Sequence, residues 1–331
     1  MESIYYVLSW LCHRTCPHCY EDRFRPYYGS DLRRVSDEAR ANFRRVIANF
    51  PERMMYRDTG GADRPGTVIL AGGEVLLEAV REPVLYPALE LLWERYAGAV
   101  QLVVQTTGDL VTPRIVDELV ARNVAVISVS GVDHFHAGLE EASAQAVLRE
   151  KLTRIFEQAG LRYGGTRGEP WGDRRRYHFF GATPDVWIGK LWPRGRAWLN
   201  DLSTADVTEN FCNRWSGGLG FLDYGREGSE VSVDPDGRVY PCCLKTKLAI
   251  GSLLEESLES ILRRHADNPV YQAISAGTPE RMGLAHGWSE ARFREESRTA
   301  TPSGRHYENL CIGCDRFHEQ VLAHQNLVTI R

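Results

Sequence analysis

Three cysteines near the start of the chain, Cys12, Cys16 and Cys19, form a C-x3-C-x2-C array within the stretch "CHRTCPHCYE". Cysteine thiolates hold zinc in tetrahedral sites that need four ligands, or they hold iron–sulfur clusters. A set of three therefore either finds a fourth ligand, such as His13 or His18, or leaves one metal position open. Three thiolates on one loop suit three corners of a four-iron cluster whose fourth iron accepts an external ligand.

The composition is that of an ordinary globular protein, with 331 residues of which 43% are hydrophobic and 25% charged. The net charge of −4 gives no basic field to attract nucleic acid, so no nucleic-acid partner is expected. The sequence contains neither an apolar run of about 18 residues nor a secretory signal at its start. We therefore expect a cytoplasmic protein with no membrane partner.

Five further cysteines lie far along the chain, at Cys212, Cys242, Cys243, Cys311 and Cys314. A reducing cytoplasm keeps thiols free, so eight cysteines favour metal binding or catalysis over disulfides. Their uneven distribution predicts two metal regions.

Hydrophobic periodicity predicts strands that alternate with helices through the first half of the chain. The expected strands cover 3–10, 66–71, 99–109 and 124–131, and the expected helices cover 36–50 (with Ser36 as its cap), 81–97 and 112–123. Such alternation predicts a parallel sheet, with its chemistry at the carboxyl ends of the strands. The cysteine loop, "GGE", "QTTGD" and "SVSGVDHFH" each follow a predicted strand, so they should meet at one site.

The second half of the chain has shorter elements. We expect a glycine-rich loop at 164–176, one more strand at 176–182, and a smaller domain beginning near residue 201. Within that domain, residues 230–243 predict a hairpin that turns at Asp236–Gly237, 257–265 predict a helix, and 278–305 predict an extended loop.

The three-cysteine array, on a loop after the first strand and with His18 before its last cysteine, resembles the signature of the radical S-adenosylmethionine (SAM) superfamily. This resemblance implies a partial (β/α)6 TIM-type barrel over 1–200. It also implies a [4Fe–4S] cluster whose open iron binds SAM and supplies the electron that cleaves it to a 5′-deoxyadenosyl radical.

The same resemblance suggests residues that bind SAM. Gly72, Gly73 and Glu74 match the family's "GGE" turn, where the glycines let backbone groups approach the methionine amine and Glu74 counters its charge. Thr107 lies near the usual position of an asparagine. Ser128 and Ser130 are placed to contact ribose, or else they only alternate on a strand.

The C-terminal cysteines resemble those of the twitch and SPASM subfamilies, in which a Gly-x4-Cys segment is followed by a Cys-x2-Cys pair. Here Gly237 to Cys242 has the first spacing, and Cys311 with Cys314 forms the pair. A full SPASM domain uses more cysteines than are available, so the resemblance implies a C-terminal α+β twitch (SPASM-like) domain over 201–331. It would hold one auxiliary [4Fe–4S] cluster, with the expected ligands Cys212, Cys242, Cys311 and Cys314.

Cys243 is left without a role in that count. Neighbouring side chains on a strand point to opposite faces, so Cys242 and Cys243 should not serve the same iron. Cys243 is then either a buried thiol or a hydrogen-atom donor to a substrate radical, as in radical SAM epimerases.

Several polar residues are candidates for substrate contact. Asp133, His134 and His136 follow a strand, where they would bind a polar substrate, move a proton or cap the loop. Lys190, Arg194 and Arg196 lie in "GKLWPRGRAW", where an arginine would pair with a carboxylate.

The length and cluster count resemble those of radical SAM enzymes that act on sugars, aminocyclitols and nucleosides in antibiotic biosynthesis. The leading expectation is hydrogen abstraction from a sugar or nucleoside followed by decarboxylation, similar to cytosylglucuronate decarboxylase, with electrons from flavodoxin or ferredoxin. Epimerisation with Cys243 as donor, similar to the neomycin-type epimerase, and dehydrogenation are alternatives.

Two other classes remain open. "CCLK" at Cys242 to Lys245 resembles a segment of the enzyme that forms arsinothricin, which implies transfer of the 3-amino-3-carboxypropyl group of SAM. A zinc-stapled binding module is the non-enzymatic alternative, and it would not cleave SAM.

Overall fold

A computed structural model describes residues 1–164, 175–181, 190–214 and 216–324. The predicted glycine-rich loop lies outside the described residues except at its two ends. Within the described part of the chain, none of the helices has the length and apolar character needed to span a bilayer.

The central feature is one sheet with the strand order β11-β10-β9-β1-β4-β5-β6-β8-β7. Its strands are β1 (Ser3–Val7), β4 (Thr67–Ala71), β5 (Gln101–Thr106), β6 (Val126–Val129), β7 (Arg162–Tyr163), β8 (Arg176–Phe179), β9 (Glu230–Val233), β10 (Arg238–Tyr240) and β11 (Gly251–Ser252). The strands from β9 to β7 in this order are parallel, and β10 and β11 are antiparallel additions at one edge. This confirms the α/β class with a large parallel sheet.

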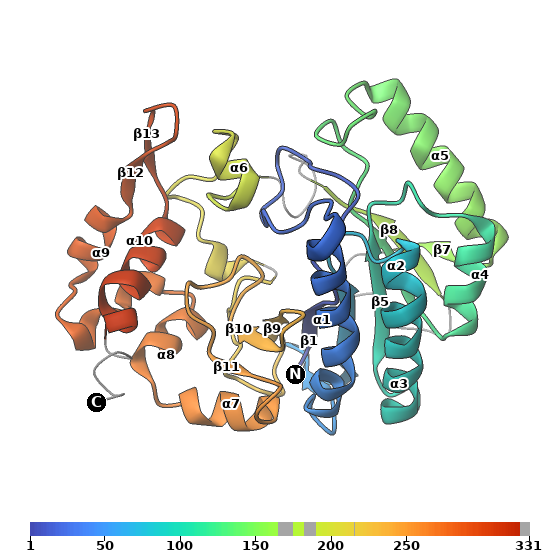
Figure 1. Cartoon of the computed structure of the whole chain (residues 1–331). Helices are drawn as coiled ribbons and strands as arrows, with labels where there is room; N and C mark the ends of the chain where they lie inside the picture. The colour runs from blue at the N-terminus through green and yellow to red at the C-terminus, as the bar shows by residue number, and fades with distance from the viewer. Residues whose placement is uncertain (165–174, 182–189, 215, 325–331) are drawn as a thin grey trace.

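Helices connect the parallel strands and lie together on the right of Figure 1, with the C-terminal helices on the left. The connecting helical segments are α1 (Gly29–Ala48), α2 (Glu78–Val80), η1 (Arg81–Leu85), α3 (Tyr86–Tyr96), α4 (Pro113–Ala121) and α5 (Ala142–Gln158). A small hairpin of β2 (Met55–Arg57) and β3 (Asp63–Pro65) lies between α1 and β4 in the sequence.

Helix α1 begins earlier than predicted. Ser36 is inside the helix, and the N-cap is Tyr28, whose side chain makes no capping hydrogen bond. The helical apolar stripe extends upstream of Ser36 through Val35 and Leu32, which pack on the core. Burial of this stripe outweighs the local preference of serine for a cap.

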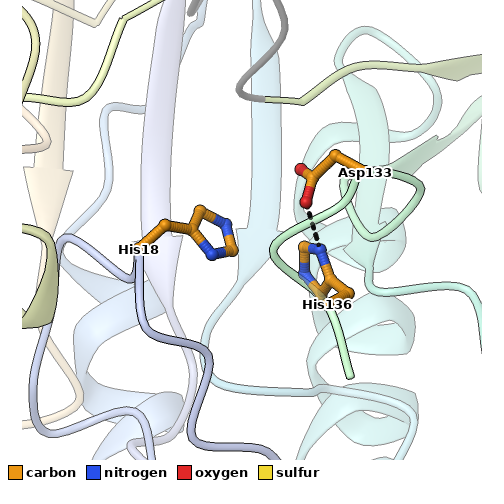
Figure 2. Close-up of side chains that lie close together, drawn as sticks. All are labelled: His18, Asp133 and His136. Atoms are coloured by element: carbon orange, nitrogen blue, oxygen red, sulfur yellow. Dashed lines mark hydrogen bonds and ion pairs between the residues drawn. The ribbon is translucent and has the colours of Figure 1, made fainter. Parts of the chain in front are cut away.

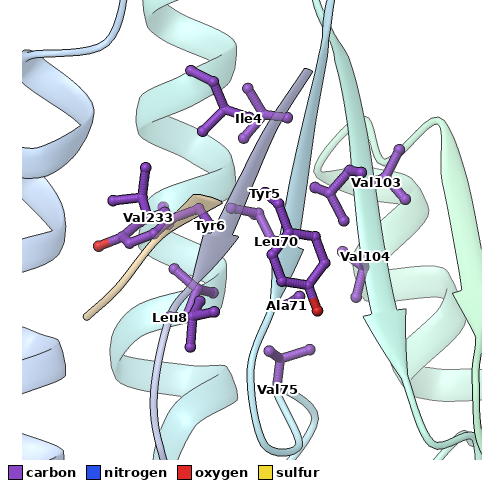
Figure 3. Close-up of a cluster of buried hydrophobic side chains, with 14 of the residues drawn as sticks. Ile4, Tyr5, Tyr6, Leu8, Leu70, Ala71, Val75, Val103, Val104 and Val233 are labelled. Atoms are coloured by element: carbon purple, nitrogen blue, oxygen red, sulfur yellow. The ribbon is translucent and has the colours of Figure 1, made fainter. Parts of the chain in front are cut away.

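The two faces of the sheet differ in character. Tyr6, Leu70 and Val104 are in register on one face, with Val233 beside Tyr6, and they are among the buried side chains labelled in Figure 3. This face packs on the helical side, where Tyr6 meets Phe50 with ring centroids 5.8 Å apart. Fully burying each such side chain stabilises the fold by about 1.5–3 kcal/mol.

The opposite face carries polar side chains. Gln105, Ser128 and His178 are in register across β5, β6 and β8, and Tyr5 of β1 is in register with Ser232 of β9. In a barrel-like sheet this is the interior face, where a ligand would lie.

The C-terminal part extends the same sheet. The predicted hairpin is present, with β9 and β10 joined by a turn in which Gly237 has φ of 78°. Because β9 pairs with β1, the sheet runs across the expected division near residue 201, and that division remains a prediction. The remaining elements are α6 (Gly195–Leu199), η2 (Phe211–Asn213), α7 (Leu258–His265), α8 (Pro269–Ser275), η3 (Pro279–Arg281), η4 (Leu284–His286), α9 (Glu290–Glu296), β12 (Arg298–Ala300), β13 (His306–Glu308), α10 (Leu310–Phe317) and η5 (His318–Leu322).

The expectation of an extended loop at 278–305 was wrong. This stretch contains η3, η4, α9 and β12. Buried Met282, Trp288 and Phe293 anchor it, and the Trp288 ring packs on Phe317 at 5.4 Å. These anchors are too widely spaced to give a periodic signal in so polar a sequence.

Replacing Leu70 by alanine should lower the free energy of unfolding by about 2–5 kcal/mol, because this fully buried side chain would leave a cavity. Urea denaturation followed by circular dichroism measures the loss. Val147→Ala on α5 is the control, since Val147 is 68% exposed and its change should stay within about 0.5 kcal/mol. Equal losses in the two variants would contradict this assignment of the core.

Candidate functional site

The three-cysteine loop leaves the carboxyl end of β1 and returns to the start of α1. Its ends are held together where Cys12 N donates to Arg25 O at 3.1 Å. Burial, together with the nearby sulfurs of Cys16 and Cys12, raises the pKa of Cys19 to about 12. Three thiols held close together on a fixed loop fit three corners of a [4Fe–4S] cluster.

The "GGE" turn after β4 packs directly against this loop. Gly73 N donates to Ser9 O at 3.1 Å, and Glu74 N donates to Leu11 O at 2.9 Å. A Cβ atom on Gly73 would lie 2.3 Å from Leu11 O and 2.8 Å from the Cβ of Cys12. Only glycine permits this approach, so the turn and the cysteine loop form one rigid unit. Gly72 is similarly close, since a Cβ there would lie 2.8 Å from Ser9 O.

Glu74 does not present a free carboxylate to the methionine amine, as the sequence suggested. Its carboxylate is buried and accepts hydrogen bonds from Leu76 N at 2.8 Å, Thr106 Oγ1 at 2.9 Å and Thr107 N at 2.7 Å. Burial nonetheless raises the pKa of Glu74. These contacts make Glu74 a tie between the ends of β4 and β5. Thr107 joins the site through this tie.

Asp109, which the sequence reading passed over, extends the tie to the cysteine loop. Its carboxylate accepts from His13 Nε2 at 2.6 Å and from Arg14 Nη2 at 2.8 Å. Arg14 also donates to Ala137 O, after β6, at 2.9 Å. Against the opposing effect of burial, the His13, Thr107 and Arg14 contacts hold the pKa of Asp109 well below its usual range. The signal available in the sequence was the "TTGD" at a strand end.

Three side chains from two loops meet beside the array, as Figure 2 shows. Potential ligand atoms of His18, Asp133 and His136 all lie within 4.8 Å of one another, and His136 Nδ1 is 2.7 Å from Asp133 Oδ1. The His18 ring stacks on Phe135 with centroids 4.9 Å apart. His134 is exposed and packs on Phe135, outside this group.

The pKa values of His18, which is half-buried, and of His136, which is buried, shift in opposite directions. Burial lowers the pKa of His18 to about 4. Burial also opposes protonation of His136, but its contacts with Asp133 and with the side chain of Cys16 raise its pKa to about 9. The Asp133–His136 pair therefore faces the cysteine array.

The two predicted ribose contacts lie on β6 and just after it. Ser128 Oγ is 2.8 Å from His178 Nε2 on the interior face of the sheet. Ser130 Oγ donates to Thr106 O at 3.4 Å, and its backbone N donates to the same oxygen at 2.9 Å. Ser130 is thus held by β5, while Ser128 faces the interior with His178.

The second set of cysteines lines one pocket, to which Cys212, Cys242, Cys311 and Cys314 all contribute. Burial and then the nearby cysteines raise the pKa of Cys212. Burial and then the charge of Asp315 raise the pKa of Cys314. Four thiols in one enclosed pocket fit a [4Fe–4S] cluster. Two of these cysteines lie in similar N-caps. Asn210 Oδ1 accepts a hydrogen bond from Cys212 N at 3.0 Å, and Asn309 Oδ1 accepts one from Cys311 N at 2.9 Å. The repeated Asn-x-Cys is the sequence signal for this pair of turns, and cysteine spacing alone does not reveal it.

Arg194 lines this pocket instead of pairing with a substrate carboxylate. Its Nη2 donates to Asp315 Oδ1 at 2.8 Å, and its Nε donates to Leu244 O at 3.1 Å. Lys190 is half-exposed, with Nζ 3.8 Å from Glu209 Oε2. Neither cation joins the interior face of the sheet.

Cys242 and Cys243 both pack against the buried cluster that contains Phe211 and Leu244, but their other neighbours differ. The pocket with the four cysteines includes Cys242 but not Cys243. Cys243 instead lies near Tyr5, Tyr20 and Glu230. The Tyr5 and Tyr20 hydroxyls are 3.3 Å apart. Strand β10 ends at Tyr240, so both cysteines lie in the bend after it and not on the strand that the alternation argument assumed. Of the two, only Cys242 lines the pocket.

A buried ion-pair group joins the two cysteine regions. Lys245 Nζ lies 2.7 Å from Glu21 Oε2 and 2.7 Å from Asp234 Oδ1. Arg23 and Lys245 also lie over the Trp10 ring, at 3.6 Å and 4.5 Å from its centroid. This group fastens the segment after Cys19 to the segment after Cys243.

Comparison with known proteins identifies the C-terminal domain. Residues 225–315 match the SPASM family, described as an iron–sulfur cluster-binding domain, which confirms the expected auxiliary cluster domain. No curated protein sequence matches the chain.

Solved structures with a related arrangement include BtrN in complex with AdoMet and 2-DOIA, with 14% identity, TM-score 0.45, and 84% of this chain and 88% of that chain covered. Native anSMEcpe with bound AdoMet has 14% identity and TM-score 0.44, with both chains fully covered. Streptococcus suis SuiB bound to S-adenosylmethionine has 12% identity and TM-score 0.40, with 83% of this chain and 67% of that chain covered.

Gly73→Ala should release the three-cysteine loop, because the added Cβ collides with backbone atoms that cannot move independently. After anaerobic reconstitution, we expect iron to fall from about eight to about four per chain, as one of two four-iron clusters is lost. Gly60→Ala, in the exposed loop between β2 and β3, is the control and should retain the iron. Full iron in Gly73→Ala would refute the close contact.

Lys245→Met should lower the free energy of unfolding by about 1.5–3 kcal/mol, because the buried Glu21 and Asp234 lose one of their two shared cations and keep only Arg23. Lys247→Met is the matched control, since Lys247 is 47% exposed and its pairs contribute at most about 1 kcal/mol. Urea titration compares the two variants. Similar small losses would show that the ion-pair group does not hold the two regions together.

Proposed function

We propose that this chain, a radical SAM enzyme with a SPASM-type C-terminal domain, abstracts hydrogen from a sugar or nucleoside bound at the interior face of its sheet. The radical SAM class rests on the three-cysteine loop, its contact with the "GGE" turn and the iron–sulfur domain match. A cytoplasmic location and an electron donor such as flavodoxin or ferredoxin belong to the same proposal.

The observation that carries the substrate class is the set of buried polar atoms on that face. Gln101 Oε1, His178 Nδ1 and Ser232 Oγ are buried without a hydrogen-bond partner among the described residues. Leaving such atoms unpaired costs about 1–3 kcal/mol each. All three lie on strands whose register brings them to the face that also carries Tyr5 and Gln105. A ligand with several hydroxyl or amide groups would satisfy them.

In the proposed mechanism, Cys12, Cys16 and Cys19 hold the SAM-binding cluster, and the Cys212, Cys242, Cys311 and Cys314 set holds the auxiliary cluster. When bound, the first cluster and SAM supply the 5′-deoxyadenosyl radical. Gly73 keeps the cysteine loop and the SAM-binding turn together. Interior polar groups orient the substrate, and enclosure by the sheet excludes water from the radical.

Among the possible outcomes, the position of Cys243 favours epimerisation. Its thiol, near Tyr5 and Tyr20, would return a hydrogen atom to the substrate carbon from the face opposite the abstraction. The sulfur radical left behind needs one electron from the external donor and one proton to become a thiol again. Decarboxylation, the leading expectation from the sequence, loses support because Arg194 is committed to Asp315.

Cys243→Ala tests this outcome. We expect the variant to cleave SAM to 5′-deoxyadenosine with dithionite but to give no epimer from a panel of aminoglycosides and nucleosides. The wild type in deuterium oxide should place one deuterium at the inverted carbon. Val147→Ala is the control and should behave as the wild type.

Other results would redirect the assignment. Unchanged turnover by Cys243→Ala would exclude the donor thiol and restore decarboxylation or dehydrogenation. Methylthioadenosine as the SAM product would favour aminocarboxypropyl transfer. Bound zinc with intact SAM would overturn the enzyme class.

A further inference from the structure

A three-residue segment lies between the two cysteine regions and contacts both. It consists of Arg194, Gly195 and Arg196 at the start of α6, which we call the α6 bracket. The sequence offered these arginines as substrate contacts, but their side chains bind backbone and carboxylate groups next to the cysteines. Neither arginine has a role in the proposed substrate reaction.

Arg196 forms hydrogen bonds with the backbone of the first cysteine loop. Its Nε donates to Cys16 O at 2.8 Å, its Nη1 to Asp22 O at 3.1 Å and its Nη2 to Phe24 O at 2.9 Å. The planar guanidinium reaches three carbonyls that are spread over nine residues, which the single ammonium of a lysine cannot do.

Backbone contacts and one further side chain reinforce this grip. Ala197 N donates to Cys19 O at 3.3 Å, and Asn200 Nδ2 donates to Pro17 O at 3.0 Å. A Cβ on Gly195 would lie 2.5 Å from Tyr20 O, and Gly195 has φ of 49°. The start of α6 therefore rests directly on the backbone of Cys19 and Tyr20, and only glycine allows this approach.

Arg194 points the other way, into the pocket with the four cysteines. Two of its partners lie close in sequence to cysteines of this pocket. Asp315 directly follows Cys314, and Leu244 is two residues after Cys242. Its Nη2 also donates to Cys311 O at 3.5 Å. The Arg194 side chain is only 13% exposed, so these bonds are shielded from water.

We propose that the α6 bracket positions both cluster-binding sites, Arg196 for the SAM-binding cluster and Arg194 for the auxiliary cluster. Because the two arginines are separated by one glycine, the bracket also fixes the distance between the two cysteine sets. This role rests on the ligand assignment of the cysteines and is independent of the substrate.

The test uses the full chain after anaerobic reconstitution with iron and sulfide, with iron counted per chain and the reduced protein studied by electron paramagnetic resonance. Arg196→Gln and Gly195→Ala should each retain about four of about eight irons. In the wild type, adding SAM should change the electron paramagnetic resonance spectrum of the reduced protein. In these two variants, adding SAM should leave the spectrum unchanged. Arg194→Gln should also retain about four irons, but its spectrum should still change when SAM is added.

Two conservative variants and one control complete the design. Arg196→Lys should hold less iron than the wild type, because it cannot reach three carbonyls. Arg194→Lys keeps a cation beside Asp315, so it serves as the test if Arg194→Gln does not fold. Its circular dichroism spectrum should match that of the wild type, and it should lose the iron of the auxiliary cluster. Arg154→Gln, at an exposed position on α5, should retain about eight irons.

Two results would overturn the proposal. Full iron with a normal response to SAM in Arg196→Gln would show that the cysteine loop does not need the bracket. Loss of both clusters from both glutamine variants would show general destabilisation without a separate role for each arginine. Neither readout depends on turnover, so failure of the epimerase proposal would not affect this test.

Discussion

The close backbone contact between the turn after β4 and the cysteine loop after β1 is the constraint on which the rest of the site depends. Gly73 has room for no side chain, so the two loops cannot move separately. Hydrogen bonds of Glu74, Asp109 and Arg14 connect this contact to the ends of β5 and β6. These hydrogen bonds bring four strand ends together into one surface.

The C-terminal domain joins this surface through the sheet and not through a flexible linker alone. Strand β9 pairs with β1, the strand that delivers the first cysteine loop. The Lys245 ion pairs and the α6 bracket also connect the first cysteine loop to the C-terminal domain. Three different kinds of interaction therefore fix the two cysteine sets relative to each other.

The interior face of the sheet has a different chemical character from the helical face. Its buried polar atoms are costly for folding alone, yet they are retained on β5, β8 and β9. Such groups are typical of ligand sites, where binding satisfies atoms that the fold leaves unpaired. Cys243 lies near Tyr5 and Tyr20 at this face, and burial raises the pKa of its thiol.

The sequence by itself determined the order of the first strands and helices, the position of the chemistry at strand ends, and the grouping of seven cysteines into two sets. The first two features follow from hydrophobic periodicity, which is local, and the grouping of the cysteines follows from the resemblance of their spacing to that of a known family. Only the tertiary structure decided that Glu74 and Arg194 are committed to protein partners and that Asp109 belongs to the site. It also decided that residues 278–305 are built around Trp288 and Phe293, and that Cys242 lines the pocket while Cys243 does not. Each of these depends on contacts between residues far apart in the chain, and neither hydrophobic period nor motif spacing carries that information.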